Sequence, residues 1–331
     1  MTEVIPGIYR LQLPLPDSPL EHVNVYLVQG DDGALLVDTG WNREEAFDSL
    51  ESQFADIGIK FESISQIVIT HIHPDHYGLA GELKELCQAK IALHNVEKDL
   101  IDSRYVNMDK LLHQIEQWLY INGVPHDELP KLQMASLRAA KFVTHAMPDV
   151  VLQGGETIST GLFSFRVIWT PGHAPGHISL YEPSQKILIS GDHILPTITP
   201  NVGLHPQSGD NPLGDYLNSL DSLKQLEVNL VLPGHEYPFN NLKQRIEELI
   251  RHHQQRNSEI LTSIQSEPKT GYQISTSLTW MSDTNGAGWE DLTPLDKRLA
   301  VVETLAHLEA MRFGGKVDKS LKDSIIYYQL A

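Results

Sequence analysis

The stretch Thr70-His71-Ile72-His73-Pro74-Asp75-His76 decides how this sequence is interpreted. It directly follows a short, β-branched apolar run that predicts a strand. Side chains two residues apart on an extended segment point the same way, so His71 and His73 can face one metal ion. Asp75 and His76 come after the turn made by the proline and can face a neighbouring position. One short segment therefore offers two ligands to each of two adjacent ions.

Four further strand-like runs also end in polar residues. Residues 34–37 lead into Asp38-Thr39-Gly40, residues 165–169 into Thr170-Pro171-Gly172-His173, residues 186–190 into Gly191-Asp192, and residues 228–232 into Pro233-Gly234-His235. Polar groups at strand ends converge on one edge of a sheet, where loops present them from a rigid base. Imidazoles and carboxylates are the ligands of Zn²⁺ and similar divalent ions. The sequence thus predicts a metal centre at a sheet edge.

The rest of the chain predicts an α/β architecture, because amphipathic patterns alternate with the apolar runs. Helices are expected over residues 44–54, 79–87 and 212–225. Residues 97–149 are expected to form a helical insertion, with helices at 97–104, 108–121 and 126–145. Beyond residue 240 the pattern predicts helices at 241–265 and 295–313 and a final strand at 324–330. We therefore expect a catalytic domain over residues 1–240 and a small, mostly helical domain over 241–331.

Composition limits the function classes. The 331 residues include 25 Lys+Arg and 43 Asp+Glu, a net charge of −18, and 41% are hydrophobic. Such acidity disfavours a nucleic-acid partner, whose binding depends on Lys and Arg. No run approaches the ~20 apolar residues that span a bilayer, so no membrane partner is expected. The single cysteine, Cys87, and the absence of a basic-then-apolar N-terminus favour the cytoplasm.

In order along the chain, the motifs DTG, THIHPDH, TPGHAPGH, SGD and PGHE resemble those of metallo-β-lactamase-fold hydrolases over about residues 3–240. The resemblance implies an αββα sandwich with two metal ions at one edge. The implied ligands are His71, His73 and His173 for the first ion, Asp75, His76 and His235 for the second, and Asp192 between them. Residues 251–256, 270–274 and 306–309 resemble the winged-helix-like C-terminal domain of the branch that includes the lactamase-β-like proteins.

The resemblance implies a hydrolase in which two ions, Zn²⁺ with Mn²⁺ or Fe²⁺ as alternatives, share a hydroxide that attacks an acyl carbon. Asp75 is the expected catalytic residue, since it would orient the hydroxide and relay a proton to the leaving group. The expected substrate is a small or medium thioester, ester, lactone or lactam. Two alternatives stay open: a phosphodiesterase or ribonuclease, which the acidity disfavours, and a single-iron sulfur dioxygenase, which would leave the second position empty.

Several residues near these motifs have open roles. Asp38 is expected to orient a metal ligand, and His177 and His193 are expected not to be ligands. Tyr77 is expected either to touch substrate or simply to pack. Trp118 and Phe142, in the insertion, are expected either to pack within it or to cap the metal edge as an apolar wall. The C-terminal domain is expected to pack or to form a homodimer.

Overall fold

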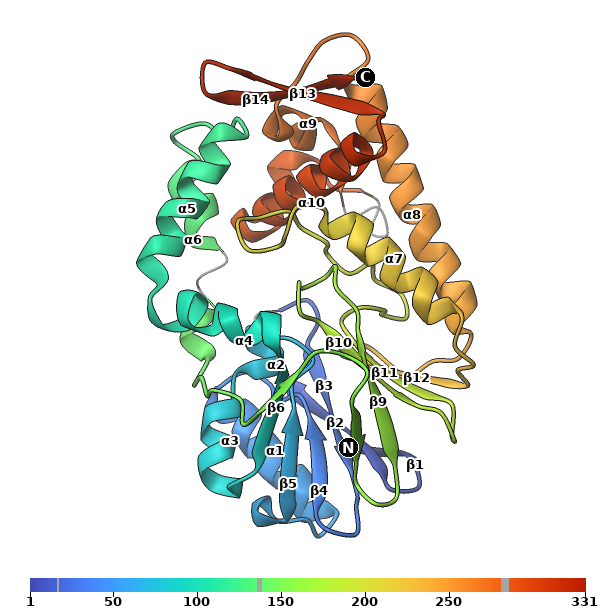
Figure 1. Cartoon of the computed structure of the whole chain (residues 1–331). Coiled ribbons are helices and arrows are strands. Elements are labelled where there is room, and N and C mark those ends of the chain that lie inside the picture. Colours follow the sequence, from blue (N-terminus) through green and yellow to red (C-terminus); the bar gives the residue numbers. More distant parts are fainter. Residues whose placement is uncertain (17, 136–138, 281–285) are drawn as a thin grey trace. The chain divides into compact units, whose positions relative to one another are not determined.

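The computed structural model describes residues 1–331 except 17, 136–138 and 281–285 (Figure 1). Its first sheet has seven strands in sequence order. The strands are β1 (Thr2–Ile5), β2 (Ile8–Pro14), β3 (His22–Val28), β4 (Ala34–Val37), β5 (Ile64–Val68), β6 (Lys90–His94) and β7 (Val150–Leu152). Strands β1 to β4 pair antiparallel, whereas β4 to β7 pair parallel. The parallel strands therefore end at the same edge of this sheet.

The second sheet has the order β12-β11-β10-β9-β8. Its strands are β8 (Thr157–Ser159), β9 (Ser164–Trp169), β10 (Ile178–Glu182), β11 (Ile187–Gly191) and β12 (Leu230–Pro233). Strands β11 and β12 are parallel, with Ile189 opposite Leu232 and Gly191 opposite Pro233. The residues that follow these two strands consequently leave the sheet side by side.

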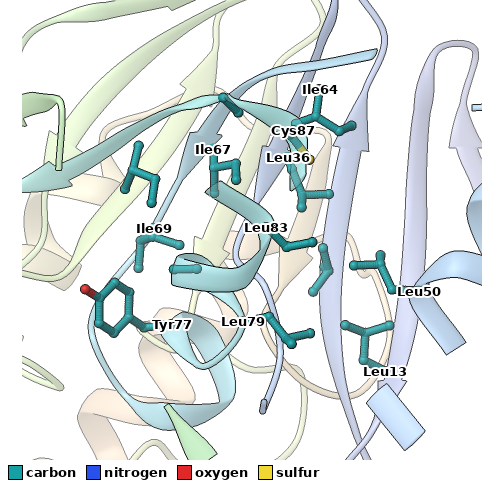
Figure 2. Packing of buried hydrophobic residues seen from close by; sticks show 14 of the residues in the cluster. Leu13, Leu36, Leu50, Ile64, Ile67, Ile69, Tyr77, Leu79, Leu83 and Cys87 are labelled. Atoms are coloured by element: carbon teal, nitrogen blue, oxygen red, sulfur yellow. The ribbon is translucent and has the colours of Figure 1, made fainter. Parts of the chain in front are cut away.

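The two sheets share one buried core, to which Tyr26 and Val68 contribute from the first sheet and Phe165 and Ile189 from the second. A second core covers the other face of the first sheet (Figure 2). There Leu50 of α1 (Glu44–Asp56) and Leu83 of α3 (Ala80–Cys87) pack with strand residues, and Cys87 is buried as a small apolar side chain. Helix, sheet and sheet are thus stacked, as the mixed α/β prediction requires.

The chain divides into two compact units. The first comprises Met1–Val106, Ala139–Pro200 and Ser219–Ile246, and the second comprises Asn107–Arg138, Asn201–Asn218 and Glu247–Ala331. This division differs from the expected boundary near residue 240, because residues 107–138 and 201–218 group with the C-terminal region. The physical reason is a shared core, in which Leu111, Ile115 and Leu119 pack with side chains such as Val301 and Leu305.

The second unit is mostly helical. Its elements are α5 (Met108–Ile121), α6 (Leu129–Ala135), the first half of α7 (Pro212–Lys224), most of α8 (Leu242–Ser263), α9 (Gly271–Ser277), α10 (Pro294–Phe313) and the hairpin of β13 (Val317–Lys322) and β14 (Ile325–Leu330). Thr270 caps α9 and Thr293 caps α10, each with a reciprocal hydrogen-bond pair to the third helical residue. Among the helices that the structure describes, none is long and apolar enough to cross a membrane.

Most expected elements are present within a few residues, but the helix expected over residues 126–145 is wrong. Helix α6 covers only Leu129–Ala135, a short 3₁₀ turn covers Ala140–Phe142, and residues 136–138 lie outside the described part. The backbone beyond this turn pairs with the first unit instead: Thr144 donates to the Gly78 carbonyl and accepts from Gly81 N–H. The sequence does not predict strand β10, because Ser179 interrupts the apolar run in its sequence ISLYE.

Candidate metal centre

Asp38 directly follows strand β4 and contacts residues of the candidate site. Asp38 is buried, has a φ of 65°, and accepts hydrogen bonds from the Thr70 N–H (2.8 Å) and hydroxyl (2.9 Å). Its Oδ2 also accepts from Nδ1 of His76 at 2.8 Å. Fixing Nδ1 in this way leaves Nε2 of His76 as the nitrogen that points into the site. Asp38 therefore has the geometry of the orienting residue that the sequence predicted.

Three imidazoles form the first ligand group. His73 Nδ1 lies 2.9 Å from His71 Nε2 and 3.1 Å from His173 Nε2. Two nitrogens bound to one tetrahedral zinc ion are about 3.3 Å apart, so this spacing needs little adjustment to hold an ion. Burial, reinforced by the neighbouring imidazoles, holds the pKa of both His71 and His73 well below the usual range. Neutral imidazole is the form that binds metal.

The second group comprises Asp75, His76 and His235. Asp75 Oδ2 lies 3.3 Å from His235 Nε2 and 3.8 Å from His76 Nε2. Nδ1 of His235 is 2.9 Å from the His22 carbonyl, so its Nε2 is likewise directed inward. Asp75 and His76 lie on the short helix α2 (Pro74–Tyr77), which begins at the proline that the sequence placed at the turn.

Asp192 lies between the two groups. Its Oδ2 is 3.3 Å from His76 Nε2, 3.4 Å from His235 Nε2 and 3.6 Å from His173 Nε2. A carboxylate in this position contacts members of both groups at once. The structure thus brings together all seven side chains that the sequence singled out as metal ligands, namely His71, His73, Asp75, His76, His173, Asp192 and His235.

The residues fit divalent ions by two independent observations. First, Nε2 of His76, Nε2 of His235 and Oδ1 of Asp192 are buried without a hydrogen-bond partner in the described part of the chain. Buried polar atoms without partners are costly, and a bound cation would satisfy them. Second, Gly234 lines the site so closely that a Cβ there would lie 2.3 Å from Asp192 Oδ1 and 2.9 Å from His76 Cε1. Because Gly234 has no side chain, the space beside Asp192 and His76 stays open for their side chains.

Charge inside the site favours cations. Burial raises the pKa of Asp75, but His76 and His235 outweigh it and bring that pKa to about 2. For Asp192, burial is outweighed in the same way by His235 and His76, so its pKa lies well below the usual range. Burial opposes the protonation of His235, yet the carboxylates of Asp192 and Asp75 raise its pKa to about 10. Two ionised carboxylates thus lie within 4 Å of the same imidazole nitrogens, and their negative charge favours a bound cation.

His177, which the sequence predicts not to be a ligand, contacts the chain beside Asp192. Its Nδ1 lies 2.8 Å from the Thr170 hydroxyl, and its Nε2 accepts a hydrogen bond from the Asp192 backbone N–H at 3.2 Å. The ring also lies against Gly191, whose φ is 50° and where a Cβ would be 2.6 Å from Nε2. The only sequence signal was its place four residues after His173 in TPGHAPGH. It is not among the grouped ligand atoms of the described residues, and it holds the chain beside Asp192.

The aromatic residues with open roles differ in their burial and surroundings. Tyr77 is fully buried, and its hydroxyl donates to the Ala146 carbonyl at 2.5 Å. Phe142 stacks on Trp41 with ring centroids 5.1 Å apart. Trp118, in contrast, belongs to the second unit and packs against its core. A cap over the metal centre therefore stays a prediction.

Comparison with known proteins agrees with the resemblance to metallo-β-lactamase-fold proteins. A family model described as the metallo-beta-lactamase superfamily matches residues 19–235. A probable metallo-hydrolase of Bacillus subtilis (strain 168) is 26% identical over 326 residues, covering 97% of each chain. A crystal structure of a metallo-beta-lactamase family protein from Thermus thermophilus superposes with a TM-score of 0.84 at 32% identity, covering 99% of this chain and 100% of that one. A human acyl-coenzyme A thioesterase is 27% identical over 243 residues, 70% of this chain and 79% of that protein.

Proposed function

The chain belongs to the metallo-beta-lactamase superfamily, and from this premise we propose that it is a hydrolase that uses two divalent metal ions to cleave an acyl bond. Zn²⁺ is the proposed ion, with Mn²⁺ and Fe²⁺ as alternatives, because three-histidine and His-His-Asp sets suit all of them. The proposed substrate is a small or medium thioester, ester, lactone or lactam. A thioester is placed first because a relative that matches 70% of this chain is named as an acyl-coenzyme A thioesterase.

The observation that carries the proposal is Asp192 between two complete ligand groups. Each group has three donors of its own, and the Asp192 carboxylate lies within 3.6 Å of nitrogens from both. One ion does not need seven donors. A single-iron dioxygenase would have no use for the Asp75, His76 and His235 group, so the two-ion hydrolase accounts better for the residues present.

When bound, such ions lower the pKa of water from 15.7 to about 7 and polarise a carbonyl group. The chain itself supplies a proton acceptor. The Asp75 side chain is 19% exposed, more than Asp192 at 10% or Asp38 at 3%, so it is the carboxylate that substrate can approach. His76 and His235 keep the Asp75 carboxylate ionised at neutral pH, and its place in the second ligand group makes it the proposed acceptor of the proton that the attacking water releases. Returning that proton to the leaving group would complete acyl transfer to water.

The charge supports an acyl substrate rather than a nucleic acid. The net charge is −18, and residues 61–83, 167–185 and 187–223, which contain six of the seven proposed ligands, hold no Lys or Arg. A nuclease needs cations near its metal ions to bind the phosphates that flank the cut. The C-terminal order of α8, α9, α10 and the β13–β14 hairpin supports the predicted winged-helix-like branch. We interpret this region as a packing or dimerisation element in a cytoplasmic protein.

Metal analysis combined with a substrate panel tests this function. Protein purified without added metal is analysed for Zn, Mn and Fe, then assayed on thioesters, esters, lactones, lactams and single-stranded RNA and DNA. We expect two ions per chain and acyl hydrolysis that a chelator abolishes. Full activity with one iron and no zinc would assign the dioxygenase class. Chelator-sensitive strand cleavage without acyl hydrolysis would assign a nuclease instead.

A further inference from the structure

Glu97 is a buried carboxylate that belongs to neither ligand group. It lies in α4 (Asn95–Ile101), directly after β6, and its side chain is 0% exposed. Placing a carboxylate inside a protein is costly unless hydrogen bonds satisfy its oxygens. The contacts of Glu97 therefore indicate why the chain keeps it there.

Both oxygens of Glu97 accept hydrogen bonds from backbone N–H groups. Oε2 accepts from Ile72 at 2.9 Å, and Oε1 accepts from Gly176 at 2.8 Å. Ile72 stands between His71 and His73, while Gly176 follows His173 by three residues. One carboxylate therefore links the two loops that supply the first ligand group, although those loops are about a hundred residues apart in the chain.

The neighbourhood of Glu97 fixes the second loop closely. A Cβ at Gly176 would lie 2.7 Å from Glu97 Cγ and 2.8 Å from Glu97 N, so only glycine allows this approach. On the other side, Trp169 Nε1–H donates to the Pro175 carbonyl at 3.0 Å, and its ring stacks on His94 with centroids 5.2 Å apart. The loop that contains His173 is thus held from two directions, and Glu97 is the link to the His71 loop.

We propose that Glu97 is a positioning residue that sets the distance between the His71–His73 loop and the His173 loop, and thereby the geometry of the first metal position. Hydrogen bonds from backbone N–H groups to a carboxylate are short and strong, so they resist sliding of either loop. The inference rests on the proposed function, because it assigns Glu97 a role toward the ion that those three histidines would hold.

Glu97→Gln tests the role with little change in volume. The amide oxygen can still accept one N–H, but the amide nitrogen is a donor and would face the other N–H. One loop must then move away, while the ligands of the second group keep their own contacts. We expect the affinity of the first position for metal to fall 10- to 100-fold, the usual effect of losing a group that orients a ligand. The affinity of the second position should change much less.

The readout is titration of the metal-free protein with Co²⁺, whose visible absorption reports coordination geometry at each position without any substrate. Glu182→Gln is the matched control, because Glu182 is also a buried carboxylate of the first unit and accepts a backbone hydrogen bond, from Gln185. The expected result is an altered first-position spectrum in Glu97→Gln and a wild-type spectrum in Glu182→Gln. Glu97→Asp, which keeps two acceptor oxygens, should partly restore the wild-type spectrum.

Unchanged spectrum and affinities in Glu97→Gln would overturn the positioning role, as would an equal change in Glu182→Gln. If Glu97→Gln does not fold, Glu97→Asp is measured alone, and an unchanged first position in that shortened variant counts against the proposal. The two proposals fail differently. Wild-type protein that binds fewer than two ions or lacks acyl hydrolysis contradicts the proposed function, whereas an active two-ion wild type with an unaffected Glu97→Gln contradicts only this inference.

Discussion

The backbone N–H of Asp192 donates to the His177 ring, with 3.2 Å between N and Nε2. Because Nε2 accepts from a backbone N–H, it carries no proton, so a neutral His177 ring has its proton on Nδ1 and donates it to the Thr170 hydroxyl. Burial, together with His193 and His173, holds the pKa of His177 well below the usual range, which keeps that acceptor available. The residue that lies between the two ligand groups is therefore held by a histidine that belongs to neither group.

His177→Asn removes this acceptor while keeping a polar side chain. We expect a 10- to 100-fold loss in metal affinity, because Asp192 would no longer be held at its turn. Competition with a chelating dye measures the affinity. The same substitution at the exposed His145 serves as the control and should leave affinity unchanged. Equal affinities for the wild type and His177→Asn would remove His177 from the site's support.

Asp75→Asn tests the proton acceptor. The amide keeps the size of the side chain but cannot take up a proton, so kcat should fall on the order of 10²-fold or more while KM changes little. Metal content must be measured on the same preparation, since Asp75 also lies in the second ligand group. Turnover near that of the wild type, with two ions still bound, would show that Asp75 moves no proton.

Gly234→Ala tests the space around the ligands. The added Cβ would lie 2.3 Å from Asp192 Oδ1, so either the carboxylate or the main chain after β12 must move. We expect metal binding to be lost or to fall by at least 10-fold. Gly314→Ala is the matched control, because its nearest atom would be 3.5 Å away and its φ of −81° suits alanine. Isothermal titration with Zn²⁺ gives both affinities, and similar values would refute the steric argument.

The sequence alone predicted that the seven candidate ligands lie together, for a local reason. Each expected ligand follows the end of a strand by at most eight residues. Parallel neighbours such as β11 and β12 carry their last residues to the same sheet edge. Alternation of apolar runs and amphipathic segments likewise predicted the mixed α/β fold, and the resemblance to the superfamily is confirmed. The winged-helix-like branch stays a prediction.

Contacts between distant segments could not be predicted in this way. Glu97 bonds to Gly176, 79 residues away, and nothing in the local pattern of α4 distinguishes it from an exposed helical glutamate. The apolar stripe of α5 likewise predicts that Leu111 and Ile115 are buried, but not that their partners are C-terminal side chains such as Leu305. Periodicity shows which face of a helix is apolar, whereas only the folded chain shows what covers it.

Acid should weaken the second unit through a buried histidine pair. His307 Nδ1–H donates to Asn257 (2.7 Å) and its Nε2 lies 3.2 Å from His253 Nδ1, an arrangement of neutral rings. Burial, then His252 and Arg256, lowers the pKa of His253 to about 3, and burial with His253 holds the pKa of His307 well below its usual range. The unfolded chain takes up these protons near pH 6.5, whereas the folded chain does not. The contribution of the pair to the free energy of unfolding is therefore complete above pH 6.5 and is lost as the pH falls below 6.5. The loss approaches about 1.4 kcal/mol per histidine per pH unit.

Removal of one ring of this pair tests the source of the acid sensitivity. Urea unfolding of metal-loaded protein at pH 7.5, 6.5 and 5.5, followed by tryptophan fluorescence, measures the free energy of unfolding. His253→Gln removes one titrating ring and should reduce the decline between pH 6.5 and 5.5 by about 1 kcal/mol. The same change at the exposed His113 should leave the decline as in the wild type. If the free energy of unfolding falls as steeply with pH in His253→Gln as in the wild type, the histidine pair is not the source of the acid sensitivity.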